Sequence, residues 1–514
     1  MLNATVKEFS KAWWSEVYNR IIGAAVFIDD ATAECLHWDG GLFNLLSSGA
    51  VEVKSLSPFE PSAVEVVHIP IFTISPTNVI FLTPPYSKLY PSYEGKLIPE
   101  SQSIDLHSLN NEERSSVRRF VSSLNSLFDS MNIKEDIFYM GTYSSISAGV
   151  LENSPVCIAR RKNCSNPVSL ILVDRTLDLC SVTSHNLESV LDKAMSVLPR
   201  FPGHSTDVCV DMSPLCEANV VNLIEDVQLC PGCLYHPNDE SCVQTFDHMI
   251  NKSQKEVMFD VYNKLSKIDV QRSPGPKALT KVTPQTIEKI VTATKGNYDL
   301  IEKHLGLLQQ SLGVVQMLKS PVYAQCELLA GLEEQVMQNI VTSKESTSVL
   351  TQVWVKVLEA SNVVTPEQCE GIAKKIMKRL KHISSMRKIL VNYNSVLKPL
   401  ESGSGSEYQG VLQQLLEDLV ASDQPEIPDL KHRNEGLKDL LRSGLNILTS
   451  KKSRTAKRPL DNPLVILFVI GGVTAEECKQ LHRAAIMSGV DAQFIIGSTK
   501  FVTPLEGMRD ALQL

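Results

Sequence analysis

Two continuous apolar runs that lie far apart in the chain constrain its fold more than any other feature. The first run begins at Pro167 and ends in charged residues before Leu179, and the second spans Pro463 to Val473. Neither run alternates apolar with polar residues, which is typical of strands covered on both faces of a parallel sheet. We therefore expect the two runs to be neighbouring strands of one sheet. A helical pattern and a third apolar run, residues 493–497, follow the second run and predict a strand–helix–strand unit.

The long segment between these runs has almost no strand signal from residue 240 to residue 450. Apolar residues recur there at helical spacing. The predicted helices cover residues 243–268, 284–318, 322–341, 347–360, 366–398, 407–421 and 433–449. Thr283-Pro284 and Thr365-Pro366 are typical of helix starts, because a capping side chain is followed by proline at the first helical position. The predicted fold class is therefore α/β with parallel sheets and a mainly helical insertion.

The residues before the first run have an α/β pattern of their own. They predict a helix, a strand and a second helix, then two strands and a long helix. These elements cover residues 10–20, 24–28, 33–46, 64–73, 79–83 and 111–131. Parallel strands need a crossover helix between them, and only one such helix can be placed between Ile28 and Thr83. The first domain therefore looks truncated, as if strands of a doubly wound sheet were missing.

A chain of 514 residues is too long for a single hydrophobic core. We expect a short N-terminal α/β domain at residues 1–150. A second α/β domain is expected to be discontinuous and to consist of residues 151–240 and 459–514, with residues 241–458 as the inserted helical domain.

Charge and hydropathy exclude several functional classes. The chain has 50 Lys and Arg against 58 Asp and Glu, so it lacks the basic field that holds nucleic acid. No run reaches the ~20 apolar residues that a membrane-spanning helix needs. Lys7, Glu8 and Lys11 interrupt the N-terminal segment, which is therefore not a signal peptide. These observations predict a cytoplasmic protein with peripheral membrane contact and reduced cysteines.

One cysteine cluster has a spacing that zinc sites also use. Cys230-Pro-Gly-Cys233 is followed by His236 and Cys242, and a structural zinc site combines such a pair with two further ligands. The second pair here is irregularly spaced, however, and Pro-Gly is also an ordinary turn signal. The turn is the favoured interpretation, and we predict no metal ligand. His37-Trp38 and His204 are interpreted as packing residues.

The end of the first strand carries a group of charges. Asp174 and Asp178 lie four residues apart with Arg175 between them. Carboxylates at the end of a buried strand can bind metal or transfer protons. An arginine flanked by carboxylates more often forms a structural ion pair, and we favour that interpretation.

The end of the second strand resembles a phosphate-binding turn. Gly471 and Gly472 precede a predicted helix, whose N-terminus could accept an anion. Neither a dinucleotide fingerprint nor the lysine of a P-loop is present. Thr474 and Glu477 fit a capping box, in which the helix start is closed by its own side chains. We find no catalytic motif in the chain and predict neither an enzyme nor a cofactor.

One predicted helix, Pro366 to Leu390, is strongly basic on its polar side. Ile372, Ile376, Leu380 and Ile383 form its apolar stripe. Its candidate partner-binding residues are Lys374, Lys375, Lys378, Arg379 and Lys381. Such a face can bind an acidic helix or anionic lipid, and it is also what a solvated bundle helix looks like.

The two strand-end motifs together resemble the SM family, the Sec/Munc-type proteins that bind syntaxin-like SNAREs. Leu170 to Asp178 is similar to the family's hydrophobic strand ending in D-R-x-x-D, and Leu467 to Thr474 with Glu477 is similar to its F-x-x-G-G-x-T motif. The long helical segment between them matches a third domain inserted into the second. Residues 35–38, 198–207 and 231–233 resemble a divergent branch of the family.

The resemblance implies a three-domain arch that binds syntaxin or SNARE helices, needs no cofactor and acts peripherally at ER or Golgi membranes. The motif residues would be structural, and Cys180 to His185 departs from the family's usual sequence after its D-R-x-x-D motif. Two alternatives stay open. The first is a scaffold that joins a vesicle-tethering complex without controlling SNAREs. The second is a phosphate- or nucleotide-binding α/β enzyme that uses Gly471 and Gly472.

Overall fold

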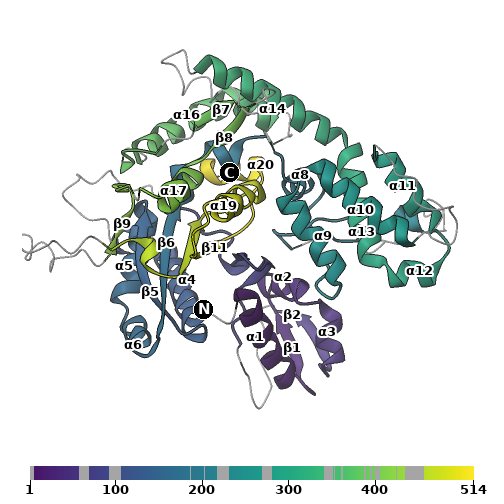
Figure 1. Ribbon diagram of the computed structural model, residues 1–514, viewed down its shortest axis with the longest axis horizontal. Coiled ribbons are helices and arrows are strands. Elements are labelled where there is room, and N and C mark those ends of the chain that lie inside the picture. The colour runs from purple at the N-terminus through teal and green to yellow at the C-terminus, as the bar shows by residue number, and fades with distance from the viewer. Residues whose placement is uncertain are drawn as a thin grey trace, which may run out of the picture.

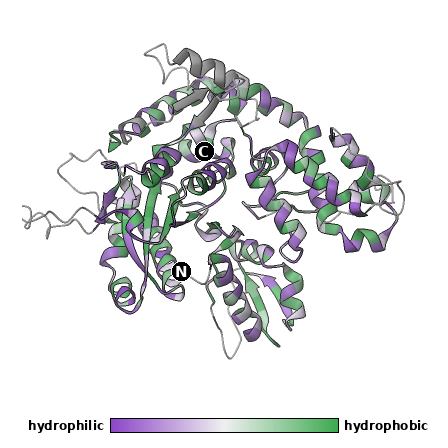
Figure 2. Ribbon diagram, in the orientation of Figure 1, coloured by the Kyte–Doolittle hydropathy of each residue, from purple (hydrophilic) through white to green (hydrophobic). Residues whose placement is uncertain are grey.

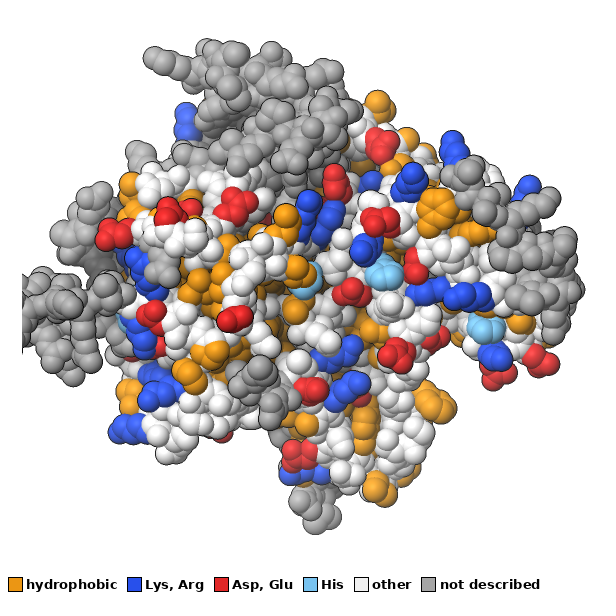
Figure 3. Space-filling view, viewed as in Figure 1, with side chains coloured by type: hydrophobic (Ala, Val, Ile, Leu, Met, Phe, Trp, Pro, Cys, Tyr) orange, Lys and Arg blue, Asp and Glu red, His pale blue; other side chains and the backbone are white. Residues whose placement is uncertain are grey.

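The computed structural model describes most of the chain. The described residues are 5–56, 67, 69–91, 106–185, 187–201, 203–216, 231–268, 281–340, 351, 354–359, 363–386, 389–393, 396–399, 406–423, 425–433 and 457–513. No helix among them is both long and apolar enough to cross a membrane. Basic and acidic side chains are interspersed on the face that Figure 3 shows.

A seven-stranded sheet forms the centre of the molecule (Figure 1). Its order is β3-β4-β11-β10-β6-β5-β9. The strands are β3 (Ile74–Thr77), β4 (Ile80–Leu82), β5 (Ile133–Met140), β6 (Asn166–Asp174), β9 (Lys431–His432), β10 (Leu464–Ile470) and β11 (Gln493–Ser498). β6 pairs with β10 in parallel, with Leu170 opposite Ile466. The two apolar runs are therefore neighbours, as predicted.

The central strands β6 and β10 are almost wholly apolar, and both of their faces are covered (Figure 2). Side chains alternate between the two faces of a strand. Leu170 and Phe468 pack in the cluster that α4 (Asn111–Ser130) and α5 (Thr142–Asn153) cover. Ile171 and Leu467 pack in the cluster on the other face. That face is covered by α17 (Val411–Val420) and α19 (Ala475–Met487).

The predicted strand–helix–strand unit is confirmed, since β10, α19 and β11 follow one another and β10 pairs with β11 in parallel. The long helix expected at 111–131 is confirmed as α4. The missed elements include β5, α5 and α6 (Pro155–Asn163), as well as β2 (Glu52–Ser55) and α8 (Val190–Val197). β3 occupies part of a segment expected to separate two strands, and the described residues of the strand expected at 64–73 are not in a strand.

The N-terminal region contains a small parallel sheet of its own. The region consists of α1 (Val6–Arg20), β1 (Ala25–Ile28), α2 (Asp30–Trp38), α3 (Leu42–Ser47) and β2 (Glu52–Ser55). β1 and β2 pair in parallel. The helix predicted at 33–46 is divided in two, because Gly40 and Gly41 adopt φ values of 112° and 76°, which interrupt a helix.

The insertion is mainly helical, as predicted. Its helices are α9 (Glu240–Asn251), α10 (Gln254–Ile268), α11 (Pro284–Ala293), α12 (Tyr298–Lys303), α13 (Leu305–Lys319), α14 (Pro321–Ile340) and α16 (Cys369–Met386). The pattern at 284–318 thus forms three helices. α14 and α16 form the outer arc in Figure 1. Residues 351 and 354–359 are helical, as predicted, and residues 434–449 of the last predicted helix lie outside the described residues.

Two short strands replace predicted helix ends in the insertion. β7 (Val396–Pro399) and β8 (Ser406–Gln409) pair antiparallel where the sequence predicts the last turns of one helix and the first of another. The seven-stranded sheet also takes β3, β4 and β5 from the first 150 residues. A boundary at residue 150 stays a prediction, and this sheet membership leads us to propose a boundary near residue 70 instead.

Candidate functional site

Arg175 is the centre of a buried ion-pair cluster. β6 ends at Asp174, and the following turn places the Arg175 guanidinium at the start of α19. One terminal nitrogen of the guanidinium donates to both Glu477 carboxylate oxygens at 2.8 Å. The second terminal nitrogen donates to the Asp178 carbonyl at 2.6 Å. The Arg175 side chain is only 2% exposed. Burial opposes its charge, but Glu477 and Asp178 outweigh this effect and raise the pKa of Arg175.

Asp174 points away from this cluster. Its carboxylate accepts hydrogen bonds from the Tyr143 and Ser144 backbone amides at 2.8 and 2.7 Å, and from the Ser144 hydroxyl at 2.6 Å. It therefore closes the N-terminus of α5. Burial raises its pKa to about 6, although these hydrogen bonds oppose the shift. The sequence placed Arg175 between two aspartates. In the structure its carboxylate partners are Asp178, 3.9 Å away, and Glu477, which is far away in the sequence but only 2.8 Å away in space.

Asp178 holds a third element to the cluster. One of its oxygens accepts from the Val411 backbone amide at 2.9 Å and from the Ser181 hydroxyl at 2.8 Å. Val411 is the first residue of α17. The strand-end charges therefore tie β6 to α5, α17 and α19, and every hydrogen bond named here is internal to the fold.

The backbone amides of Thr474 to Glu477, at the start of α19, all donate to side chains of the protein itself. Thr474 and Glu477 form the predicted capping box. The next two amides, of Ala475 and Glu476, donate to the Asp192 carboxylate at 2.9 and 2.6 Å. Burial raises the pKa of Asp192 to about 7. A Cβ at Gly471 would lie 2.9 Å from the Arg175 Cβ, so this glycine permits close approach to Arg175.

The basic helix α16 has the predicted apolar stripe. Ile376, Leu380 and Ile383 are buried, and Ile372 is partly buried against the same cluster. The Arg379 side chain donates to the Ala511 carbonyl of α20 (Pro504–Leu512) at 2.9 Å. Arg379 therefore anchors α16 to α20. The exposed members of the predicted set are Lys374, Lys375, Lys378 and Lys381.

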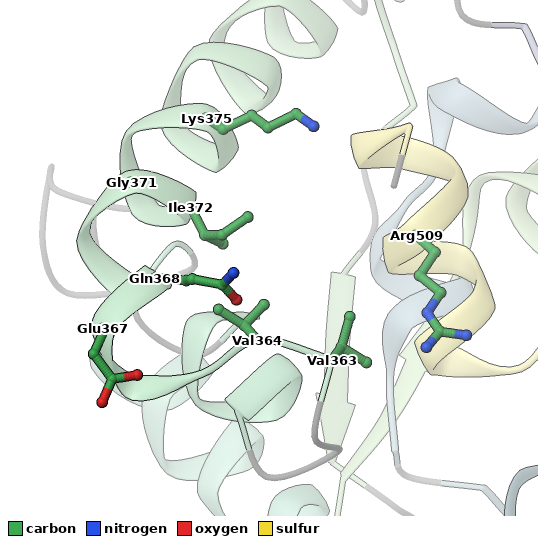
Figure 4. Close-up of a pocket in the computed structure, with 8 residues that line it drawn as sticks. All are labelled: Val363, Val364, Glu367, Gln368, Gly371, Ile372, Lys375 and Arg509. Carbon is green, nitrogen blue, oxygen red and sulfur yellow. The ribbon is translucent and has the colours of Figure 1, made fainter.

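A groove of about 740 Å³ runs beside this helix (Figure 4). Val363, Val364 and Ile372 form its apolar part, and Glu367 lies at one end. Lys375 and Arg509 stand on opposite sides, one from α16 and the other from α20. Together, the exposed lysines and the groove form the candidate partner surface.

A second polar cluster joins the N-terminal region to residues 204–207, which precede the insertion, and sequence reasoning missed most of it. The buried Glu34 accepts from the Ser205 amide at 2.8 Å and from the Thr206 hydroxyl at 2.6 Å. The indole of Trp38 donates to Thr206 at 2.8 Å. His37 Nε2 lies 2.9 Å from an oxygen of the buried Asp207. Burial lowers the pKa of the neighbouring His204 to about 4.

The cysteine motif contributes to the same region. His236 Nε2 lies 3.0 Å from the Cys233 carbonyl oxygen, while Cys230 lies outside the described residues. The Leu234 and Tyr235 amides donate to Asp207 at 3.1 Å each. The Pro-Gly-Cys segment thus packs against Asp207 and, through it, against His37. No local pattern in the sequence indicates this arrangement, because the partners of Asp207 lie on distant segments.

Comparison with known proteins shows what this chain is similar to. Residues 263–510 match the Sec1 family. Sec1 family domain-containing protein 2 of Mus musculus is 26% identical, with 86% of this chain and 75% of the relative covered. The Homo sapiens protein of that name is 25% identical with the same coverage. The predicted resemblance to the SM family and to a divergent branch of it is confirmed.

Two solved structures share the fold over nearly the whole chain. The first is the Unc18–syntaxin 1 complex from Monosiga brevicollis, with a TM-score of 0.60, 12% identity and 99% of both chains covered. The second is Sly1p in complex with an N-terminal peptide of Sed5p, with a TM-score of 0.53 and 13% identity. It covers 99% of this chain and 97% of the other. At these identities the likeness establishes the SM-type fold.

Proposed function

We propose that this chain, which carries a Sec1 family domain on an SM-type fold, binds syntaxin-type SNARE proteins and takes part in vesicle traffic. The supporting observation is the fold shared over nearly the whole chain with two proteins solved with syntaxin 1 and with a Sed5p peptide. The activity is binding without catalysis. An arch that holds partner helices in place lowers the entropy lost when they assemble.

The outer face of the insertion is the surface we propose for the partner. Leu328 on α14 is 71% exposed, although it is a large apolar residue. The four exposed lysines of α16 provide positive charge, and SNARE helices that present acidic faces would complement it. We further propose that the protein is cytoplasmic, attaches to ER or Golgi membranes through its partners, and can contact a tethering complex there.

A binding experiment with matched charge variants tests this proposal. Purified protein is measured against immobilised cytoplasmic regions of syntaxins from the ER, Golgi, endosomes and plasma membrane. We expect the wild type to bind an ER or Golgi syntaxin. Leu328→Asp, or Lys→Glu at positions 374, 375, 378 and 381, should weaken binding at least about tenfold, the equivalent of 1.4 kcal/mol.

The matched control reverses four other exposed lysines of the insertion. Lys252, Lys255, Lys295 and Lys303 lie on or beside α9 to α12, and their exchange for Glu should leave binding unchanged. If both sets of variants lose binding equally, the effect comes from the change in net charge and not from the α16 lysines. If no syntaxin binds and pulldowns from cells recover tether subunits alone, the scaffold function replaces SNARE binding.

A further inference from the structure

Three side chains of types that can bind a metal converge from distant segments beside the N-terminal region. His37 lies on α2, Asp207 follows the 198–206 segment, and Cys233 belongs to the Pro-Gly-Cys segment. One ligand atom from each residue lies within 4.8 Å of the other two. We propose that these three residues bind Zn²⁺ and that His204, which lies beside His37 but outside this group, moves toward the ion to supply the fourth ligand. This inference does not depend on SNARE binding.

The ligand types suit zinc. Imidazole nitrogen, carboxylate oxygen and thiolate sulfur are the groups that bind Zn²⁺ in proteins, usually as four tetrahedral ligands. With zinc–nitrogen and zinc–oxygen distances of about 2.0–2.2 Å, two such ligands stand about 3.3 Å apart. His37 Nε2 and Asp207 Oδ2 are 2.9 Å apart. The ion would therefore replace the proton between these two atoms once their separation increases by a few tenths of an ångström.

The surroundings hold these ligands in place. Asp207 is 1% exposed and accepts hydrogen bonds from the Val208, Leu234 and Tyr235 amides. Two of those amides immediately follow Cys233, so the carboxylate also positions the segment that carries the thiol. The Cys233 amide donates to Gln309 of α13 at 3.1 Å. Hydrogen bonds that orient ligands in this way are usual around metal sites.

His204 provides an independent observation that points to a ligand. Its ring centroid lies 4.9 Å from that of His37. Its Nδ1 is buried and has no hydrogen-bond partner among the described residues. A buried polar atom left without a partner is destabilising and calls for an explanation such as a bound ion. The Nδ1 lone pair is what a fourth ligand requires.

The consequence is a metal link between the N-terminal region and the insertion. α2 contributes His37, while Cys233 is held by α13 of the insertion. Binding to the folded state alone stabilises that state by mass action. Zinc would thus hold the N-terminal region against the segments that carry Asp207 and Cys233, the second of which contacts the insertion through Gln309.

The test measures metal content of the full chain, expressed without a polyhistidine tag in zinc-supplemented medium. Wild type should contain about one zinc per chain by mass spectrometry, as a four-ligand site requires. Cys233→Ser and His37→Asn should lose most of it, and His204→Asn should bind more weakly. The controls are Cys209→Ser and His248→Asn, which alter a cysteine and a histidine outside the cluster and should retain the metal.

A second measurement needs only the wild type, in case the variants misfold. Chelator-treated protein is titrated with ZnSO₄, and in parallel with Co²⁺, whose absorption reports a tetrahedral site with a thiolate ligand. Restored thermal stability together with this spectrum supports the site. The proposal is overturned if the wild type is purified without zinc and shows no Zn²⁺ binding on titration. It is also overturned if a folded Cys233→Ser protein keeps its metal.

Discussion

At the scale of single residues, the Arg175 cluster shows what the sequence can and cannot predict. The capping box of Thr474 and Glu477 was predictable because its two members lie three residues apart. The bond from Arg175 to Glu477 was not, because it joins positions 302 residues apart. Local charge spacing suggested Asp174 as a partner of Arg175, yet Asp174 bonds to α5. The partner of a buried charge is determined by the fold and not by proximity in the sequence.

Glu477→Gln tests the strength of this pair. Gln keeps the capping geometry but leaves the buried Arg175 charge without its closest carboxylate. We expect the free energy of unfolding to fall by about 3–5 kcal/mol in urea titration. The control is Glu188→Gln, because Glu188 is 56% exposed and pairs with Lys479. That change should cost at most about 1 kcal/mol. Equal losses in the two variants would contradict a special role for Arg175.

Asp192 predicts a pH dependence of stability. Its pKa in the folded state is about 7, whereas an unfolded Asp titrates near 3.9. The folded chain therefore holds a proton that the unfolded chain has lost. The resulting stabilisation is complete below about pH 4 and disappears as the pH rises to about 7. Asp192→Asn removes this contribution.

The measurement compares urea unfolding of wild type and Asp192→Asn between pH 4 and pH 8. The stability of the wild type relative to the variant should fall across this range by a few kcal/mol, since one pKa unit corresponds to about 1.4 kcal/mol. A difference that stays constant with pH, or grows in favour of the wild type, would refute the raised pKa.

At the scale of elements, strands were predictable where both faces meet the core. β6 and β10 are almost wholly apolar, so periodicity identified them. β5 was missed because Glu135 and Asp136 interrupt its pattern. Glu135 is nevertheless buried, since Arg160 and Arg161 donate to it at 2.6 and 2.8 Å. The charge that hid this strand in the sequence is neutralised by two arginines of α6.

A pair of glycine substitutions tests the packing of strand against helix. A Cβ at Gly497 on β11 would lie 2.4 Å from the Phe468 ring and 2.5 Å from the Phe81 ring. Gly497→Ala should therefore destabilise the protein by about 1–3 kcal/mol. Gly371 on α16 has nothing within 4 Å of such an atom. Gly371→Ala should instead stabilise by about 0.5–1 kcal/mol. Thermal unfolding of both variants distinguishes these signs.

At the scale of the whole molecule, the sequence predicted which segments form a sheet but not the complete sheet. The sheet order places β4, which ends at Leu82, beside β11 near the other end of the chain. Nothing local in either segment encodes that pairing. The SM-type fold was predictable because two motifs mark the neighbouring strands β6 and β10. The contacts of the N-terminal region depend on buried polar residues such as Glu34, which have no sequence signature.

Glu34→Ala should weaken the attachment of the N-terminal region to the segment that carries Ser205 and Thr206. Its carboxylate accepts hydrogen bonds from Ser205 and Thr206, and their loss leaves buried donors without partners. We expect faster hydrogen exchange in α2, with exchange in β6 and β10 unchanged. Glu52→Ala, at an exposed position of β2, is the control. Uniform acceleration throughout the chain would indicate general destabilisation instead of local release.

The pairing of β6 with β10 determines when this protein can finish folding on the ribosome. β6 emerges early, but one of its two neighbours begins only at Leu464. At a translation rate of 5–20 residues per second, the wait lasts roughly 15 to 60 s. Throughout that time the apolar edge of β6 is open to other nascent chains. We therefore expect the growing chain to be prone to aggregation until β10 is synthesised.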